Sequence, residues 1–496
     1  MTIAETSYGK VRGAEIADGV LAWRGIPYAA PPAGGLRLRP PQPPQRWAGV
    51  RDALAYGNRS LQPGPAAGVP GPPLPPADED CLYLNVTAPA GAVPAGTRGR
   101  PVLLWIHGGG FETGDGAGQP GDGAVFARSH GVVVVTFNYR LGALGFLDVP
   151  GERPTGAFGL HDQVAALRWT RDNIAGFGGD PGQVTVYGQS AGGKSVTHLL
   201  ASPLARGLIS RAAESSGADH VKDPQQARDL AGRFLRVLGT TAQRIRAVPA
   251  SDLLAAQLAV ESPPHSSWIW RPSVDGAALT ASPLAAIAGG AAAGVPLLLQ
   301  TCARETALYQ RTDPRAAAQA DRVLAGYFGE RRAAELLAAY AAAYPELDET
   351  ALRGVTVMTD ERYVVRTERL AGAHAAHAPV WRSRYDGPYL GAEDSPDPEF
   401  ARSAHLLHGA HGSDLAGIWQ GGAGPAAALH AAWGAYAAAG DPGWPRYSPE
   451  TGRQAMIFTA DGPQLAADPF ARAREAWAGL TWQPGTWWPV AGLGGA

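Results

Sequence analysis

The sequence predicts an α/β protein with a mostly parallel central β-sheet flanked by helices. Apolar runs of strand length at residues 82–86, 102–106, 132–138 and 184–188 alternate with helical patterns such as 162–173. Continuous apolar runs are typical of strands buried on both faces, and their alternation with helices favours parallel connections. Residues 9–28, which are rich in turn signals, predict a small N-terminal β region before this sheet.

The domain organisation follows from length and from local composition. A chain of 496 residues with 45% hydrophobic residues can form one large unit, and we expect residues 1–496 to be a single domain. The proline-rich stretch 61–76 cannot lie inside a sheet or helix, so it predicts a surface loop. Alanine and leucine at helical spacing predict helical insertions that form a layer at about residues 222–370.

Composition excludes several classes of function. The 42 Lys and Arg residues against 44 Asp and Glu residues provide no basic field for nucleic acid. No stretch has membrane-spanning length and the N-terminus lacks a signal-peptide pattern, so we expect a cytoplasmic protein without a membrane partner. Cys81 and Cys302 have neither a disulfide framework nor metal-ligand spacing. The richness in alanine, glycine and arginine suggests a bacterial coding sequence.

The pattern G-x-S-x-G at residues 188–192 is the main candidate for chemistry. It directly follows the strand-like run 184–187 and precedes a helix-compatible segment, which is the context of the nucleophile elbow in the α/β-hydrolase fold. Ser190 would be the nucleophile, and the Ala191 N–H would face an oxyanion formed beside it. A chance match in a glycine-serine turn remains the alternative for this motif alone.

Three consecutive glycines at 108–110 follow His107 and the apolar run 102–106. A loop of this kind upstream of the elbow supplies further N–H donors to an oxyanion hole, and we assign Gly109 and Gly110 to it with Ala191. An ordinary flexible glycine turn is the alternative, which the elbow downstream argues against. A serine nucleophile also needs a histidine base oriented by a carboxylate, but 12 histidines and 44 acids cannot be sorted by composition.

Further motifs resemble those of the type B carboxylesterase family across essentially the whole chain. They are the segments at 25–29 (GIPYA), 79–85 (EDCLYLN), 138–142 (NYRLG), 177–181 (FGGDP) and 440–442 (GDP). The resemblance implies the α/β-hydrolase fold and hydrolysis of a small-molecule ester through an acyl-enzyme, with no cofactor and no metal. It also implies buried ion pairs between Arg37 and Glu79 and between Arg140 and Asp162.

The resemblance places the remaining catalytic residues. The acid corresponds to Glu305, at the end of the run 296–305, and the base to His411 in the segment 409–415. His405 and His408 are rivals for the base because the register of that loop is open. Ser216 corresponds to a family serine that supports the acid and base.

Two departures from the family pattern bear on the substrate. Gln189 stands where an acidic residue is usual beside the nucleophile, and the 61–76 loop has no tryptophan to stack on a quaternary ammonium. Both argue against cholinesterase activity and favour neutral esters. Ser60 stands where a cysteine pairs with the residue matching Cys81, so that disulfide is absent, as suits a reducing compartment.

Aromatic residues near the site indicate which class of ester to expect. Phe111 follows the glycine loop, and Trp268 falls where the family forms its acyl pocket, which favours short-acyl or aryl esters. A hydrolase of amides or carbamates with the same triad is one alternative, and a non-catalytic binding protein on the same fold is another. We expect a monomer or a homodimer.

Overall fold

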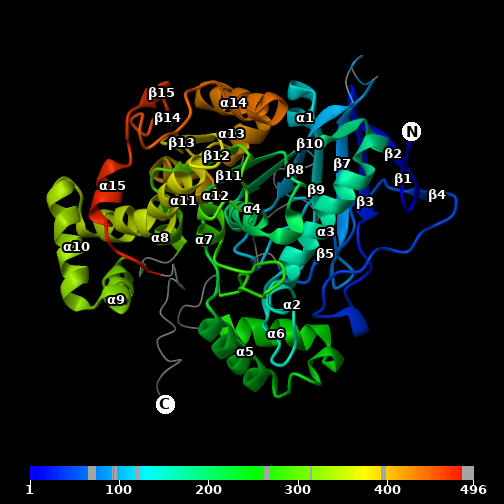
Figure 1. Cartoon of the computed structure of the whole chain (residues 1–496), viewed down its shortest axis with the longest axis horizontal. Coiled ribbons are helices and arrows are strands. Elements are labelled where there is room, and N and C mark those ends of the chain that lie inside the picture. The colour runs from blue at the N-terminus through cyan, green and yellow to red at the C-terminus, as the bar shows by residue number, and fades with distance from the viewer. Residues whose placement is uncertain are drawn as a thin grey trace.

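The computed structural model describes residues 1–64, 74–91, 93, 96, 98–118, 123–261, 269–312, 316–391 and 398–482. These residues form a 13-stranded sheet covered by helices (Figure 1). The large, mostly parallel sheet flanked by helices confirms the predicted fold class. Residues 65–73 of the proline-rich loop, and Trp268, lie outside the described residues.

The sheet order is β1-β2-β3-β7-β9-β8-β10-β11-β12-β13-β14-β15, with β4 beside β2 and β5 paired with β6 separately. Strands β9, β8, β10, β11, β12, β13 and β14 run parallel, whereas β1, β2, β3 and β7 form an antiparallel N-terminal region. The strands are β1 (Thr2–Thr6), β2 (Gly9–Ala17), β3 (Val20–Pro27), β4 (Val50–Asp52), β5 (Arg59–Ser60), β6 (Ala77–Asp78), β7 (Tyr83–Pro89), β8 (Arg100–Ile106), β9 (Val133–Phe137), β10 (Gly179–Gln189), β11 (Arg211–Ser215), β12 (Leu297–Cys302), β13 (Val380–Tyr385), β14 (Ala455–Thr459) and β15 (Gly462–Ala466).

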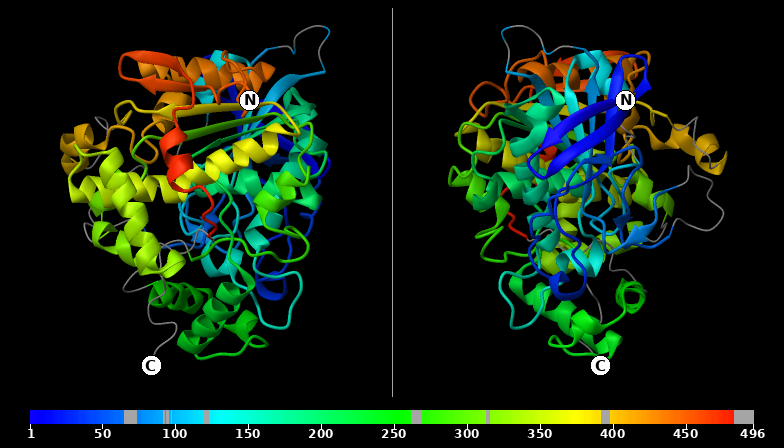
Figure 2. Two further views of the ribbon diagram at one scale, coloured as in Figure 1. Left: turned by 60° about the vertical axis from the view of Figure 1, so that its left-hand side comes forward. Right: turned by 90° about the vertical axis from the view of Figure 1, so that its right-hand side faces the viewer.

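Helices lie on both faces of the sheet and at its ends, as the two turned views also show (Figure 2). They are α1 (Ala124–His130), α2 (Gly142–Phe146), α3 (Phe158–Asn173), α4 (Ala191–Ala201), α5 (Pro224–Leu238), α6 (Ala250–Glu261), α7 (Pro283–Ala288), α8 (Ala307–Thr312), α9 (Ala316–Phe328), α10 (Glu330–Ala343), α11 (Val365–Ala375), α12 (Pro398–Ser403), α13 (Leu415–Gln420), α14 (Pro425–Ala439) and α15 (Ala471–Ala476). The range 222–370 also contains β12 and two π-helical segments, Thr350–Val357 and Asp360–Val364.

Strand β8 shows why continuous apolar runs produce this layered core. Its side chains alternate between the two faces, and those of residues 102–106 are buried. Leu103 and Trp105 join a cluster with α1 and α14 residues such as Trp433. Val102 and Leu104 join a separate cluster with α3 and α4 residues. Because both faces need apolar side chains, the sequence of the strand loses the alternation expected of a half-exposed sheet.

Both predicted ion pairs are confirmed. The Arg140 guanidinium lies 2.7 Å from the Asp162 carboxylate, and their side chains are 2% and 0% exposed. Asp162 also accepts the Arg140 backbone N–H, so the pair fixes the chain that follows β9. Arg37 donates to both carboxylate oxygens of Glu79 at 2.6 Å.

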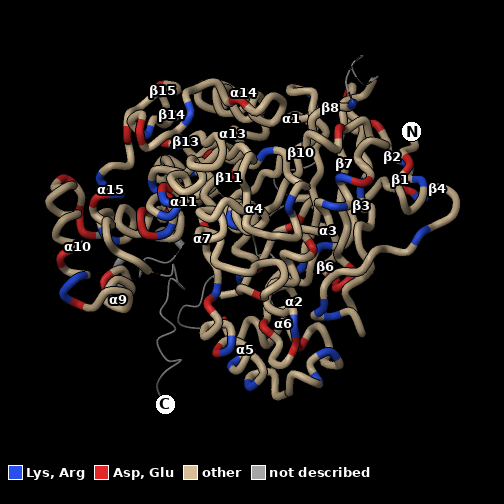
Figure 3. Tube along the Cα trace, viewed as in Figure 1, with Lys and Arg blue, Asp and Glu red and all other residues tan. Residues whose placement is uncertain are grey.

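The distribution of charged residues and the length of the apolar helices can be compared with the expectations from composition. In this view, acidic and basic residues are interspersed over the trace, and neither is confined to one region (Figure 3). In the described part of the chain, no helix is long and apolar enough to cross a bilayer.

Removing the charge of Asp162 should destabilise the protein. Because Asp162→Asn leaves Arg140 buried without its carboxylate, we expect a loss of about 3 kcal/mol in the free energy of unfolding, measured by urea denaturation. Glu335→Gln is the control, since it removes surface ion pairs to Arg331 and Arg332, whose side chains are 85% and 51% exposed. That change should stay within about 0.5 kcal/mol, and similar losses in both variants would contradict the argument.

Candidate active site

Ser190 occupies a sharp turn between β10 and α4. Its backbone angles, φ 59° and ψ −121°, are strained for a residue with a side chain. A Cβ on Gly188 would lie 2.2 Å from the Gly192 carbonyl oxygen, and one on Gly192 would lie 1.9 Å from the Ile106 carbonyl oxygen. The turn therefore requires glycine on both sides of the serine, as the G-x-S-x-G pattern predicts.

The glycine loop lies beside this turn because β8 and β10 are neighbours, with Ile106 opposite Gly188. Gly109 and Gly110 have φ values of 104° and 66°, and a Cβ on Gly109 would lie 2.2 Å from the Thr113 carbonyl oxygen. Within the described ranges, neither of their N–H groups donates to another protein group. Both groups are therefore available to an oxyanion beside Ser190 and the first residue of α4, Ala191.

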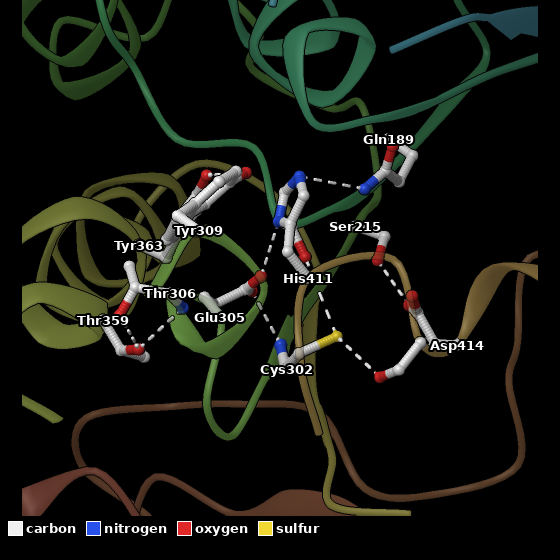
Figure 4. Close-up of polar contacts among 12 residues, drawn as sticks. Gln189, Ser215, Cys302, Glu305, Thr306, Tyr309, Thr359, Tyr363, His411 and Asp414 are labelled. Atoms are coloured by element: carbon white, nitrogen blue, oxygen red, sulfur yellow. Dashed lines mark hydrogen bonds and ion pairs between the residues drawn. The ribbon is translucent and has the colours of Figure 1, made fainter. Parts of the chain in front are cut away.

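Glu305 and His411 are in direct contact (Figure 4). Glu305 follows β12 and is fully buried, and its Oε2 lies 2.7 Å from Nδ1 of His411. The Cys302 N–H donates to the other carboxylate oxygen at 2.8 Å, and the His411 N–H donates to the Glu305 carbonyl oxygen. A carboxylate oxygen accepts, so Nδ1 of His411 is the donor in this contact.

The Nε2 atom of His411 faces the side chain of Gln189, whose amide nitrogen lies 3.2 Å away (Figure 4). The imidazole is thus held beside the elbow by the residue that precedes Ser190. Among the described residues, no hydrogen bond joins Ser190 and His411 directly. Catalytic hydrogen bonds are often long in a free enzyme and shorten when substrate binds.

The other predicted residues lie as follows. His405 and His408 are exposed, and His405 contacts the Arg402 carbonyl oxygen rather than an acid. Ser216 is buried with φ 54°, but its hydroxyl contacts the Cys302 sulfur at 3.9 Å and not Glu305 or His411. Because the Cys302 N–H binds Glu305, Ser216 reaches the acid only through this cysteine. Burial raises the pKa of the Cys302 thiol well above its usual value, which keeps it protonated.

Several residues around His411 were not predicted. The rings of Tyr309 and Tyr363 lie with their centroids 5.5 Å and 5.2 Å from the imidazole, and their hydroxyls are 3.1 Å apart. Asp414 is fully buried and accepts hydrogen bonds from Ser215 and Gln300, and burial raises its pKa. The tyrosines carry no sequence signal, whereas Asp414 could have been suspected from its place three residues after the histidine.

A small cavity opens directly beside the elbow. The described residues that line it are Gly110, Phe111, Ser190, Ala191, Lys194, His220 and Arg271. Of the two aromatic residues predicted for the pocket, Phe111 is therefore at the cavity, where its ring packs edge-on against Phe146. In the described ranges, no group of three or more His, Cys, Asp or Glu residues could hold a metal ion.

The parallel sheet, the strained serine and the buried acid–histidine pair are features of a carboxylic-ester hydrolase, and the chain belongs to the Carboxylesterase family, whose profile matches residues 1–427. It is 37% identical to a para-nitrobenzyl esterase of Bacillus subtilis over 95% of this chain and 98% of that protein. It is 34% identical to a fumonisin B1 esterase of Sphingopyxis macrogoltabida over 90% of this chain and 84% of that protein. A solved PNB esterase structure superimposes with a TM-score of 0.81 at 34% identity, covering 96% of this chain and 99% of the other.

A side chain at Gly192 should disrupt the elbow. In Gly192→Ala the Cβ would meet the Ile106 carbonyl oxygen, a backbone atom that cannot move away alone. We expect a loss of about 1–3 kcal/mol in the free energy of unfolding, measured by denaturant titration. Gly35→Ala, where a Cβ has no neighbour within 4 Å, should change stability by less than about 0.5 kcal/mol. An equally mild effect of both substitutions would count against the close packing of strand and helix.

Proposed function

We propose that Ser190, His411 and Glu305 form the catalytic triad of this carboxylesterase. The observation that carries the proposal is the buried 2.7 Å contact between Glu305 and His411, made beside a serine in elbow geometry. His411 deprotonates the Ser190 hydroxyl as its oxygen attacks the ester carbonyl, and Glu305 stabilises the resulting imidazolium. The Gly109, Gly110 and Ala191 N–H groups hold the oxyanion.

Proton movement completes the cycle. The imidazolium passes its proton to the oxygen of the leaving alcohol, and the carbon–oxygen bond of the ester breaks to give an acyl-enzyme. A water molecule, deprotonated by the same nitrogen, then hydrolyses this intermediate and regenerates Ser190. Gln189 has a supporting role: its amide holds Nε2 beside the elbow in the free enzyme, and it must release that atom when the serine proton is transferred.

Short-acyl or aryl esters are the proposed substrates. The cavity beside Ser190 is of modest size and is lined on one side by the buried ring of Phe111. The similarity to a para-nitrobenzyl esterase supports an aryl or benzyl group on the alcohol side. We further propose that the bacterial enzyme works in the cytoplasm as a single-domain monomer or homodimer. Cell fractionation and analytical ultracentrifugation test these last points.

Replacing the nucleophile should abolish ester hydrolysis. We expect Ser190→Ala to lower kcat for a para-nitrophenyl ester by on the order of 10⁵-fold or more, because the attacking oxygen is removed. Ser210→Ala is the matched control, since this partly exposed hydroxyl donates to the Gly182 carbonyl oxygen away from the site. Equal rates in the wild type and Ser190→Ala would refute the proposed function. A para-nitroanilide in the same assay tests amide hydrolysis.

The base should be His411 and not its neighbour in sequence. His411→Ala removes both the proton acceptor and the partner of Glu305, so we expect kcat to fall by roughly 10⁴-fold or more. His405→Ala should keep activity within about twofold, because this side chain is exposed and bonds only locally. Loss of activity in His405→Ala with retention in His411→Ala would reassign the base.

A further inference from the structure

The peptide group between Glu305 and Thr306 joins two other parts of the chain. Its carbonyl oxygen accepts the N–H of His411 at 3.2 Å, and its N–H donates to the Thr359 hydroxyl at 3.2 Å (Figure 4). Thr359 lies in the helical segment 350–364, which contains both π-helical stretches. The peptide group that follows the proposed acid is therefore held on one side by the loop of the proposed base and on the other by this segment.

The side chain of Thr306 makes a second connection to the 350–364 segment. Its hydroxyl oxygen lies 2.9 Å from each of the Gly354 and Val355 carbonyl oxygens and 3.2 Å from the Thr359 hydroxyl. Carbonyl oxygens only accept, so the Thr306 hydroxyl donates to them and the Thr359 hydroxyl donates to Thr306. The two threonines are 0% and 1% exposed, so these bonds are made away from solvent.

Tyr363 extends the contacts of the 350–364 segment to the base and to the helix that follows the nucleophile. It lies one turn after Thr359, and the centroid of its buried ring is 5.2 Å from that of the His411 imidazole. Its hydroxyl lies 3.1 Å from that of Tyr309, whose ring also lies near the imidazole. The Lys194 ammonium, on α4, lies 5.0 Å from the centroid of the Tyr363 ring. One helical segment thus contacts the acid loop, the base and α4.

These contacts bear on the reaction through the acid and the base. The described lining of the cavity beside Ser190 does not include Thr306, Thr359 or Tyr363. Their effect on the reaction must therefore pass through Glu305 and His411. A displacement of about 1 Å in a catalytic group can lower the rate by on the order of 100-fold, so contacts that hold an acid and a base in place matter for kcat. π-helical turns are also rare and are frequent at functional sites.

We propose that the 350–364 segment fixes the catalytic acid and base relative to each other, and that Thr306 and Tyr363 are positioning residues for ester hydrolysis. This inference rests on the proposed function, because it concerns how Glu305 and His411 are held. Thr306 acts on the acid through its backbone and hydroxyl contacts with the segment. Tyr363 acts on the base by packing beside the imidazole.

Removal of the Thr306 hydroxyl tests the first contact. Thr306→Val keeps the shape of the side chain and removes the donor, so we expect kcat for a para-nitrophenyl ester to fall by about tenfold with KM within about twofold. Thr306→Ser keeps the hydroxyl and should retain kcat within about threefold. Thr170→Val is the matched control, since this buried hydroxyl donates to the Ala166 carbonyl oxygen within α3, and it should leave kcat unchanged.

Rates are expressed per active site, titrated with a para-nitrophenyl phosphonate, so that a loss of folded protein is not read as a loss of kcat. A wild-type kcat in Thr306→Val would overturn the role of Thr306. A kcat in Thr306→Ser as low as that in Thr306→Val would do the same, because the hydroxyl would then not be the group that matters.

A double variant shows whether the two threonines act through one contact. Thr359→Val removes the hydroxyl that faces Thr306 and should also lower kcat. If both changes break the same connection, the kcat of Thr306→Val/Thr359→Val should equal that of Thr306→Val alone. Losses that multiply would indicate separate roles and would overturn the clamp between the acid loop and the 350–364 segment.

Substitution of Tyr363 tests the contact with the base. Tyr363→Leu removes the ring beside the imidazole, and we expect kcat to fall by about tenfold with KM within about twofold. Tyr363→Phe keeps the ring and should retain kcat within about threefold. Tyr344→Leu is the control, since it removes a ring that stacks on Tyr340 at the end of α10, and it should leave kcat unchanged. A wild-type kcat in Tyr363→Leu would overturn the role of Tyr363.

Ser190→Ala in the same assay separates this inference from the proposed function. A wild-type rate in Ser190→Ala would refute the proposed function itself. Loss of activity in Ser190→Ala together with a wild-type kcat in both Thr306→Val and Tyr363→Leu would overturn the positioning roles alone.

Discussion

The close approach of α4 to the end of β8 is the constraint on which the rest of the site depends. The backbone of Gly192 lies against the Ile106 carbonyl oxygen with no room for a side chain. This contact fixes three things at once: the sharp turn at Ser190, the start of α4 and the path of the glycine loop that leaves β8. The strained φ of the serine is tolerated because packed strands and a helix hold both sides of the turn. Without that contact the serine would be an ordinary turn residue.

The parallel sheet then gathers the remaining groups. Strands β8, β10, β11 and β12 are consecutive neighbours, so the residues that follow them emerge at the same edge. The glycine loop, Ser190, Ser216 and Glu305 all arise in this way. His411 does not follow a strand. Its loop is joined to Glu305 by the side-chain contact and by the His411 N–H, which donates to the Glu305 carbonyl oxygen, and it is joined to the preceding residue by the Arg304 N–H, which donates to the Gly409 carbonyl oxygen. The His411 imidazole is thus positioned through the Glu305 carboxylate.

The sequence predicted features that depend on neighbouring residues, and it did not predict contacts between residues that are far apart in the chain. The buried strands and the elbow could be predicted from local patterns. Consecutive apolar residues indicate a buried strand, and closely spaced glycines indicate the sharp turn. Glu305 and His411 are 106 positions apart, and only the family resemblance suggested their association. The contact between Gln189 and His411, the indirect role of Ser216 through Cys302, and the tyrosines around the imidazole depend on side-chain packing between distant segments. No local pattern encodes such packing.

The same limit applies to the residues around the cavity beside Ser190. Lys194 and Arg271 are far apart in sequence, and the nearly neutral composition gives no hint that folding places them around one cavity. Gln189 depends on the same kind of contact, because its amide meets the imidazole of His411, which is 222 positions further along the chain.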